Sequence, residues 1–429
     1  MFSTTTTTDT ATAEPQTRES SRTYSCCLFN ARSVVNKLYE LHQLLYVEKY
    51  DLVFITETWL HDDITNGLLD PRAIYTVYRK DRSGSHHGGV AVLVHRNLCV
   101  AEVIIDDAFN SLEILCIDLL LIKDKLRFFV VYRPPHNDAA ACSYVNLLVA
   151  CLEKYSSTEH TNFILGDFNC PRINWVNAYS PGDHISARIF DFMSSRGYSQ
   201  FINFATRGDN ILDLIFSDDD QIICSTDCCP PFGNSDHCLI EFQFVTSSKS
   251  DLKPISVQKY NWHKGDYASM EHYLQNIKWD AIIWNNPHAL HAWSAFLGLL
   301  WDAVDLHVPR FKTTVRTHKK NYHREIRKLI KKKRCLWGKC QTTPGPYTKS
   351  QYHKCTKELR RKCRELTKRH EVNVILSNNL GMFYKHVNNR ISYRSTIGAL
   401  IGENDTIVTS DSDKAYTGWA KNRTVFESL

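Results

Sequence analysis

Polar residues capable of metal binding or proton transfer recur in this sequence beside short apolar runs. Each one closes an apolar run, follows one within a few residues, or comes just before the last run. Because strand ends that share one edge of a sheet bring such residues together, we expect their side chains to meet at one site. The residues are Asn30, Glu57, Tyr132, Asp167, Asn169, Asp236 and His237.

These residue types suit the hydrolysis of a phosphodiester. A carboxylate such as Glu57 is a ligand that Mg²⁺ prefers, and this ion needs only one or two protein carboxylates beside a substrate phosphate. Asp167 could orient or deprotonate the attacking water, while Asn169 and Asn30 could position phosphate oxygens or a carboxylate without adding charge. His237 could stabilise the charge that develops in the transition state.

A buried acid beside this histidine would fix its tautomer and raise its pKa, and Asp213 is the candidate. Each residue taken alone has an ordinary structural alternative. A single Asp or Asn after a strand is more often a helix cap or a turn former, and 166–169 alone could be a turn. It is the ordered set that favours a catalytic site.

The elements that must position these residues are short strands interspersed with helices. Amphipathic helical patterns cover 37–48, 141–155 and 185–196. Mixed strands and helices over 24–246 favour a layered α/β domain. The apolar runs expected to form strands are 24–29, 52–56, 90–95, 100–105, 112–119, 126–132, 162–165, 211–216 and 238–244.

The remaining segments differ in composition. Residues 1–23 are rich in Thr and Ser and are expected to be disordered. After residue 250 the strand pattern stops, and we expect a helical linker over 247–310. A basic helical hairpin over 311–380, broken at 342–346, and a partial linker over 381–429 follow.

Cysteine usage and hydropathy indicate an intracellular protein. Fifteen cysteines are scattered through a long chain that shows no secretory signal, which favours reduced thiols. We also find no run that predicts a membrane span.

The positive charge is concentrated in the predicted hairpin. Residues 310–370 hold 22 lysines and arginines against three acids, whereas the rest of the chain holds 30 basic and 43 acidic residues. Such a cluster is typical of a nucleic-acid-binding surface, and a solvated helix face is the alternative. Whether the hairpin binds DNA or RNA stays open at this point. The candidate contacts are Lys319, Lys320, Arg324, Arg327, Lys328, Lys331, Lys332, Lys333 and Arg334.

The ordered motifs resemble the endonuclease/exonuclease/phosphatase superfamily. Residues 28–33 (LFNARS) resemble its opening Asn motif, 55–60 (ITETWL) its metal-binding Glu motif and 131–135 (VYRPP) its Tyr motif. Residues 166–169 (GDFN) supply the Asp/Asn pair, 212–216 (LDLIF) the Asp that orients a histidine, and 235–237 (SDH) the terminal pair. The resemblance extends from Asn30 to Phe244.

The resemblance implies a four-layered α/β sandwich, two packed β-sheets flanked by helices, followed here by an α-helical basic tail. It also implies a metal-dependent DNA endonuclease that uses Mg²⁺, with Mn²⁺ as an alternative. Glu57, Asn30 and Asp236 would bind the metal. Tyr132 would contact the scissile phosphate and, with Asp167, Asn169, Asp213 and His237, complete the catalytic set.

The residues within these motifs are most similar to those of the non-LTR retrotransposon branch, in jockey-like and related elements. That branch implies nicking of target DNA in the nucleus, leaving a 3′ hydroxyl that primes reverse transcription, with a reverse transcriptase domain in cis. No polymerase-type Tyr/Phe-x-Asp-Asp motif is present, so we expect a product truncated before the reverse transcriptase. The element's own RNA is a second expected partner. A phosphatase or phospholipase of the superfamily and an inactive nucleic-acid-binding remnant are the alternatives.

Overall fold

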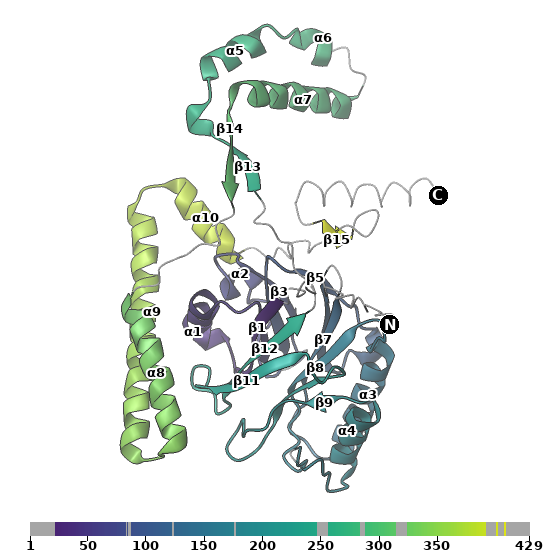
Figure 1. Cartoon of the computed structure of the whole chain (residues 1–429). Coiled ribbons are helices and arrows are strands. Elements are labelled where there is room, and N and C mark those ends of the chain that lie inside the picture. Colours follow the sequence, from purple (N-terminus) through teal and green to yellow (C-terminus); the bar gives the residue numbers. More distant parts are fainter. Residues whose placement is uncertain are drawn as a thin grey trace, which may run out of the picture. The chain divides into compact units, whose positions relative to one another are not determined.

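A computed structural model describes most of the chain. The described residues are 22–82, 84, 87–121, 124–175, 177–246, 256–283, 288–314, 324–391, 400–401 and 407–408. The N-terminal segment expected to be disordered therefore lies outside the described residues, except for Arg22 and Thr23, which begin the first strand. The chain divides into two compact units, Met1–Ser250 with Tyr322–Leu429, and Asp251–Asn321 (Figure 1).

Two six-stranded sheets form the centre of the first unit. The first sheet has the order β11 (Ile223–Cys229), β12 (Leu239–Thr246), β1 (Arg22–Asn30), β2 (Leu52–Thr56), β4 (Val90–His95) and β3 (Tyr75–Lys80). The second has the order β5 (Cys99–Glu102), β6 (Glu113–Leu120), β7 (Lys125–Tyr132), β8 (Thr161–Asp167), β10 (Asp213–Ser217) and β9 (Ser199–Gln200).

The sheets pack face to face through aromatic side chains. Phe128 of β7 stacks on Phe163 of β8 with ring centroids 4.5 Å apart, and Phe54 of β2 lies 5.5 Å from Phe128 across the interface. Because the central strands are covered on both faces, they are almost continuously apolar rather than alternating. The five residues of β2, for example, are all buried.

Helices cover the outer face of each sheet. α3 (Ala139–Tyr155) and α4 (His184–Ser195) share a core with β7 and β8 on one side (Figure 1). On the other side, η1 (Val35–Lys37), α1 (Leu38–Gln43) and η2 (Leu44–Glu48) pack against β1 and β2. The helix, sheet, sheet, helix order confirms the four-layered α/β sandwich. Short turns α2 (Asn66–Leu69) and η3 (Asp107–Phe109) complete the domain.

Aspartate caps begin both long covering helices. The Asp138 carboxylate accepts a hydrogen bond from the main-chain nitrogen of Ala141 at 2.9 Å, and Asp183 accepts one from Ser186 at 3.0 Å. Each cap satisfies a main-chain donor that the first helical turn leaves without a partner.

The second unit contains strands that the sequence pattern did not predict. β13 (Ser256–Tyr260) pairs antiparallel with β14 (Arg310–Thr314), so the expectation that strands stop at residue 250 is wrong. The two strands are far apart in the sequence and each is short, which hides the pairing from local pattern. Between them lie η4 (Trp262–Lys264), α5 (Tyr267–Gln275), α6 (Trp279–Ile283) and α7 (Ala289–His307).

The basic segment of the first unit forms a helical hairpin. α8 (Arg324–Thr342) and α9 (Pro346–Leu376) pack together through Ile326, Ile330, Leu359 and Cys363. The helices meet at 343–345, immediately before a proline that is well placed at the first position of α9. α10 (Leu380–Ile391) follows, and β15 (Leu400–Ile401) pairs with β16 (Ile407–Val408).

Ion pairs and apolar contacts fix the hairpin to the α/β domain. The Arg334 guanidinium lies 3.1 Å from the Glu48 carboxylate, and the Arg360 guanidinium lies 2.7 Å from that of Glu40. Tyr39 and Val47 pack against the hairpin core. Among the described helices, none is long and apolar enough to cross a membrane.

Candidate active site

The strand pairing brings the polar residues to one edge of the sandwich. β1 and β2 are parallel with Asn30 opposite Thr56, so Glu57 directly follows the partner position. β7 and β8 are parallel with Tyr132 opposite Asp167, and the antiparallel β10 places Asp213 opposite the same aspartate. The ends of the two sheets therefore carry these side chains toward one another.

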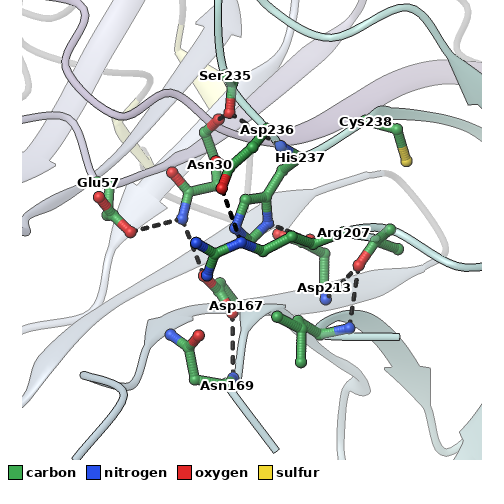
Figure 2. A network of polar contacts seen from close by, with 12 residues as sticks. Asn30, Glu57, Asp167, Asn169, Arg207, Asp213, Ser235, Asp236, His237 and Cys238 are labelled. Atoms are coloured by element: carbon green, nitrogen blue, oxygen red, sulfur yellow. Dashed lines mark hydrogen bonds and ion pairs between the residues drawn. The ribbon is translucent and has the colours of Figure 1, made fainter. Parts of the chain in front are cut away.

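Asn30 joins the two sheets at this edge. Its amide nitrogen donates to the Glu57 carboxylate at 2.8 Å and to the Asp167 carboxylate at 2.9 Å (Figure 2). The Trp59 indole donates to the second oxygen of Glu57 at 3.2 Å. Asn30 and Asp167 are fully buried, so the amide compensates part of the desolvation of a carboxylate inside the fold.

The turns that carry these residues adopt left-handed backbone conformations. Arg32, Glu57 and Asn169 have φ angles of 43°, 48° and 48°. Such a conformation costs a non-glycine residue on the order of 1–3 kcal/mol and persists only where its surroundings hold it. A hydrogen bond of 3.0 Å from the main-chain nitrogen of Asn169 to the Asp167 carboxylate is one such restraint.

Gly166 is required by the close approach of β8 to β7. Its φ is 142°, and a Cβ atom at this position would lie 1.9 Å from the carbonyl oxygen of Val131. Only glycine fits, which gives a steric reason for the first residue of the Gly-Asp-Phe-Asn motif.

Asp213 and His237 form a buried charged pair next to Asp167. The imidazole Nδ1 lies 2.7 Å from a carboxylate oxygen of Asp213, and the His237 side chain is 1% exposed. Burial lowers the pKa of His237, but the charge and the hydrogen bond of Asp213 outweigh burial and raise this pKa to about 9. The imidazole therefore carries a proton at neutral pH.

The neighbouring acids have the opposite tendency. Burial, assisted by the Asp213 carboxylate, raises the pKa of Asp167 to about 7, against the opposing effect of His237. Burial also raises the pKa of the Tyr132 hydroxyl, and the Glu57 and Asp167 carboxylates add to the rise. A carboxyl group that loses its proton near neutral pH suits a general base, and a phenol that keeps its proton suits a hydrogen-bond donor.

Two donor sets at this edge could hold a metal ion. Asp167, Asp213 and His237 present ligand atoms that all lie within 4.8 Å of one another. However, a protonated imidazole cannot bind a cation, and His237 already uses Nδ1 for Asp213. The second set is Glu57 and Asp167, whose carboxylates both accept from the Asn30 amide nitrogen and offer the oxygen atoms that a hard cation prefers. The chemistry of the second donor set fits Mg²⁺ better.

Asp236 does not lie with these donors. One of its oxygens lies 3.0 Å from a guanidinium nitrogen of Arg32, and the other lies 2.8 Å from Arg207. Its side chain is 38% exposed. Both carboxylate oxygens of Asp236 therefore face arginines, and its metal-binding role stays a prediction.

Several arginines at the site were not predicted to be functional. Two of them, Arg32 and Arg133, lie inside the quoted motifs. Arg133, in the Tyr-Arg-Pro-Pro motif, is 1% exposed and donates to the carbonyl oxygens of Phe168, Asn169 and His136. The Asn169 amide returns a hydrogen bond of 2.7 Å to the Arg133 carbonyl. The arginine thus fixes the turn that follows Asp167.

A second charged pair, Arg82 with Glu113, lies beside the Tyr132 ring. The Arg82 guanidinium pairs with the buried Glu113 carboxylate, and its carbon lies 5.7 Å from the centre of the Tyr132 ring. Neither residue of this pair lies in a recognised motif, so the sequence held no signal for it.

The predicted nucleic-acid contacts of the hairpin separate into two groups. The side chains of five are exposed: Arg324, Arg327, Lys328, Lys331 and Lys332. Lys333 and Arg334 instead face the α/β domain, where Lys333 donates to the Pro231 carbonyl at 3.1 Å and Arg334 pairs with Glu48 and Glu241. Burial lowers the pKa of Lys333 to about 8. Helical periodicity turns these two toward the α/β domain, and their role as nucleic-acid contacts stays a prediction. Lys319 and Lys320 lie outside the described residues.

Residues 126–241 match the model of a family described as endonuclease-reverse transcriptase. No curated protein matches the sequence.

Similar solved structures include the endonuclease domain of TRAS1, a telomere-specific non-LTR retrotransposon, at 14% identity and a TM-score of 0.42, covering 52% of this chain and 98% of that one. The AP endonuclease LMAP from Leishmania major has 12% identity and a TM-score of 0.42, covering 52% of this chain and 88% of that one. An AP endonuclease from Archaeoglobus fulgidus has 16% identity and a TM-score of 0.41, covering 52% of this chain and 99% of that one. The family match confirms, for residues 126–241, the resemblance to the endonuclease/exonuclease/phosphatase superfamily that the motifs indicated.

Proposed function

We propose that the chain is a Mg²⁺-dependent phosphodiesterase that nicks DNA at the target site of a retroelement and leaves a 3′ hydroxyl for target-primed reverse transcription. The observation that carries this proposal is one connected polar network. It runs from Glu57 through Asn30 to Asp167, which lies beside the Asp213–His237 pair (Figure 2). The match to an endonuclease-reverse transcriptase family supports the choice of a nucleic-acid substrate.

Glu57 is the residue that we expect to hold the metal, with Asn30 beside it. When bound, Mg²⁺ would supply Lewis-acid polarisation of a phosphoryl oxygen. Glu57 follows a buried strand and is held by Asn30 and Trp59, so its carboxylate is oriented before any ligand arrives. Preorganisation of this kind lowers the cost of reaching the transition state.

Asp167 is suited to take a proton from the attacking water. Its pKa of about 7 leaves the carboxylate largely ionised just above neutral pH, yet basic enough to accept a proton. A hydrogen bond from Asn30 and one from the Asn169 main chain fix its two oxygens. Asn169 follows in the same turn and would position a phosphate oxygen.

His237 and Tyr132 would donate hydrogen bonds to the phosphate. Asp213 binds Nδ1 of the imidazole, which leaves Nε2–H as the donor toward substrate. The positive charge of the imidazolium would offset negative charge that builds up on the phosphoryl oxygens. Tyr132 keeps its proton because burial and two carboxylates raise its pKa.

In the proposed reaction, the water oxygen forms a bond to phosphorus while the bond from phosphorus to the 3′ oxygen breaks. The water proton passes to Asp167, and the departing 3′ oxygen takes up a proton from solvent. The products are a 3′ hydroxyl and a 5′ phosphate, so the first product can prime synthesis.

The exposed face of the hairpin is the proposed second contact with nucleic acid. Arg327, Lys328, Lys331 and Lys332 share this face, and neutralising a phosphate releases counterions, which makes binding dependent on salt. Replacing these four residues by glutamine should lower the slope of log affinity against log salt by roughly 3–4. An unchanged slope would show that the hairpin does not contact the nucleic acid.

The proposed partners and location follow from the proposed function. DNA is the first expected ligand, and the element's own RNA is the second. We place the reaction in the nucleus, with a reverse transcriptase in cis.

Plasmid nicking tests the proposal. Wild-type protein with Mg²⁺ should convert supercoiled plasmid to the open circular form, whereas Glu57→Ala and His237→Ala should not. Glu159→Ala is a matched control, because Glu159 is an exposed acid beside Lys125, at the opposite end of β7 from Tyr132. Nicking that persists in both site variants would overturn the site. Wild-type protein that nicks nothing with any divalent ion would favour a phosphatase, a phospholipase or an inactive remnant.

A further inference from the structure

Two arginines beside the proposed catalytic residues share a single aspartate. Arg32 and Arg207 both bind Asp236, one to each carboxylate oxygen, at 3.0 and 2.8 Å. Their side chains are 47% and 43% exposed. We infer that Arg32 and Arg207, held by Asp236, form a binding site for a backbone phosphate next to the scissile one. This inference rests on the proposed function and adds to it.

The main chain fixes Arg32 close to Asn30. Its nitrogen donates to the Asn30 side-chain oxygen at 3.0 Å, and its carbonyl accepts a hydrogen bond of 2.9 Å from the Lys37 ammonium. The backbone of Arg32 is in the left-handed conformation, with φ of 43°. Arg32 therefore starts from a rigid turn two residues after Asn30, which donates to both Glu57 and Asp167.

Arg207 is fixed beside His237 in a similar way. A short antiparallel bridge pairs Arg207 with His237, and the main-chain nitrogen of Cys238 donates to the carbonyl of Thr206 at 2.8 Å. In Figure 2 a dashed line joins the Arg207 side chain to Asp236. Both arginines thus start from backbone positions that adjoin proposed catalytic residues.

The charge of this trio is not balanced. One carboxylate faces two guanidinium groups, so the trio carries one net positive charge. Burial opposes ionisation of Asp236, but hydrogen bonding and the two arginines lower its pKa, so the carboxylate stays charged. Each guanidinium has five N–H donors, and the ion-pair contact with Asp236 is made through one nitrogen of Arg32 and one of Arg207. Among the described residues neither guanidinium has another hydrogen-bond partner, so donors remain for a ligand.

An ion pair elsewhere in the same domain shows what a purely structural arrangement looks like. Arg127 binds both oxygens of Asp118 at 2.7 Å each, and both side chains are 13% exposed. That pair is bidentate, electrically balanced and mostly buried. The Arg32–Asp236–Arg207 trio is open, carries excess positive charge and faces solvent.

A phosphodiester is the ligand that suits two guanidinium groups with N–H donors to spare. Guanidinium groups bind phosphate oxygens through paired, charge-assisted hydrogen bonds, and such contacts do not depend on base sequence. Asp236 keeps the arginines extended before the ligand binds, so less side-chain freedom is lost on binding. Its expected role is to position the two arginines.

Duplex DNA binding by the full chain, measured by fluorescence anisotropy without divalent ions, tests the inference. Arg207→Ala and Arg32→Ala should each weaken binding by roughly tenfold at fixed salt and lower the salt slope by about 0.9, one phosphate contact each. Arg207→Lys should restore most of the slope, because it keeps the charge, but only part of the affinity. Lys154→Ala is the matched control, since Lys154 is an exposed cation paired with Asp106 near the C-terminal end of α3, away from the strand ends that carry the site.

The outcomes separate the two claims. Arginine variants that bind like Lys154→Ala in both affinity and salt slope would overturn the phosphate site. The same holds if wild-type protein binds no DNA. Wild-type protein that binds with the predicted arginine dependence but never nicks plasmid would support the phosphate site and contradict the proposed reaction. A lower affinity with an unchanged slope would indicate a structural role for the arginines and would also overturn the inference.

Discussion

The conservative substitution Asp213→Asn gives a quantitative test of the His237 assignment. Asparagine keeps the shape of the side chain, and its main-chain nitrogen can still donate to Thr206. It removes the charge that raises the pKa of His237 to about 9. Because burial lowers this pKa, we expect it to return to the ordinary value of 6.5 or below.

The expected loss follows from these two pKa values. At pH 7.5 the ratio of protonated to neutral imidazole should fall from roughly 30 to 1 to about 1 to 10, since each pKa unit is a factor of ten. The charged fraction therefore falls about tenfold. Loss of the orienting carboxylate adds a further factor on the order of 10²–10⁴, as in other aspartate–histidine pairs.

The pH profile of kcat/KM for nicking is the assay. Asp167 must lose its proton and His237 must keep its proton, so the wild-type rate should rise through about pH 7 and fall through about pH 9. In Asp213→Asn both limbs should move to lower pH, because Asp213 raises both pKa values.

Asp236→Asn is the control for the position of the alkaline limb, whatever its effect on the rate. Asp236 is the neighbour of His237, but its charge is the smallest of the contributions that raise this pKa. An alkaline limb that stays near pH 9 in Asp213→Asn would refute the assignment of His237 as a protonated donor.

Three further predictions concern the frame of the site. Gly166→Ala should prevent the α/β domain from folding, because the new Cβ would collide with a carbonyl of β7, and a native far-ultraviolet circular dichroism spectrum would contradict this. Arg133→Met should lower the free energy of unfolding by about 2–6 kcal/mol, since two buried carbonyls lose their donor, and a urea titration showing less than about 1 kcal/mol would contradict it. Glu57→Gln should raise the Mg²⁺ concentration for half-maximal activity at least roughly tenfold, while Asp236→Asn should change it by less than about twofold; equal rises would return Asp236 to the metal site.

The sandwich was largely predictable because its strands are apolar runs of ordinary length. Val90–His95 and Leu52–Thr56 begin and end where the hydropathy pattern places them. Tyr75–Lys80 and Ile223–Cys229 were missed, because they lie at the outer edges of the first sheet and are only partly buried. Strands of this kind have too weak an apolar pattern for detection from one sequence.

The candidate site was predictable to a different degree. Residues that follow a strand, such as Asn30 and Glu57, are marked by their position, and strand pairing decides that they meet. What a residue of known type contacts cannot be read from local sequence. Asp236 and His237 are neighbours, yet one is partly exposed between arginines and the other is buried on Asp213.

The chemistry of the nick tests the central claim most directly. The proposed reaction breaks the bond to the 3′ oxygen, so the nick should carry a 3′ hydroxyl and a 5′ phosphate. Treatment of nicked plasmid with DNA ligase should then reseal the strand without any end repair, and a DNA polymerase should extend the same nick directly. A nick that neither enzyme accepts until a phosphatase has removed a 3′ phosphate would contradict the proposed chemistry.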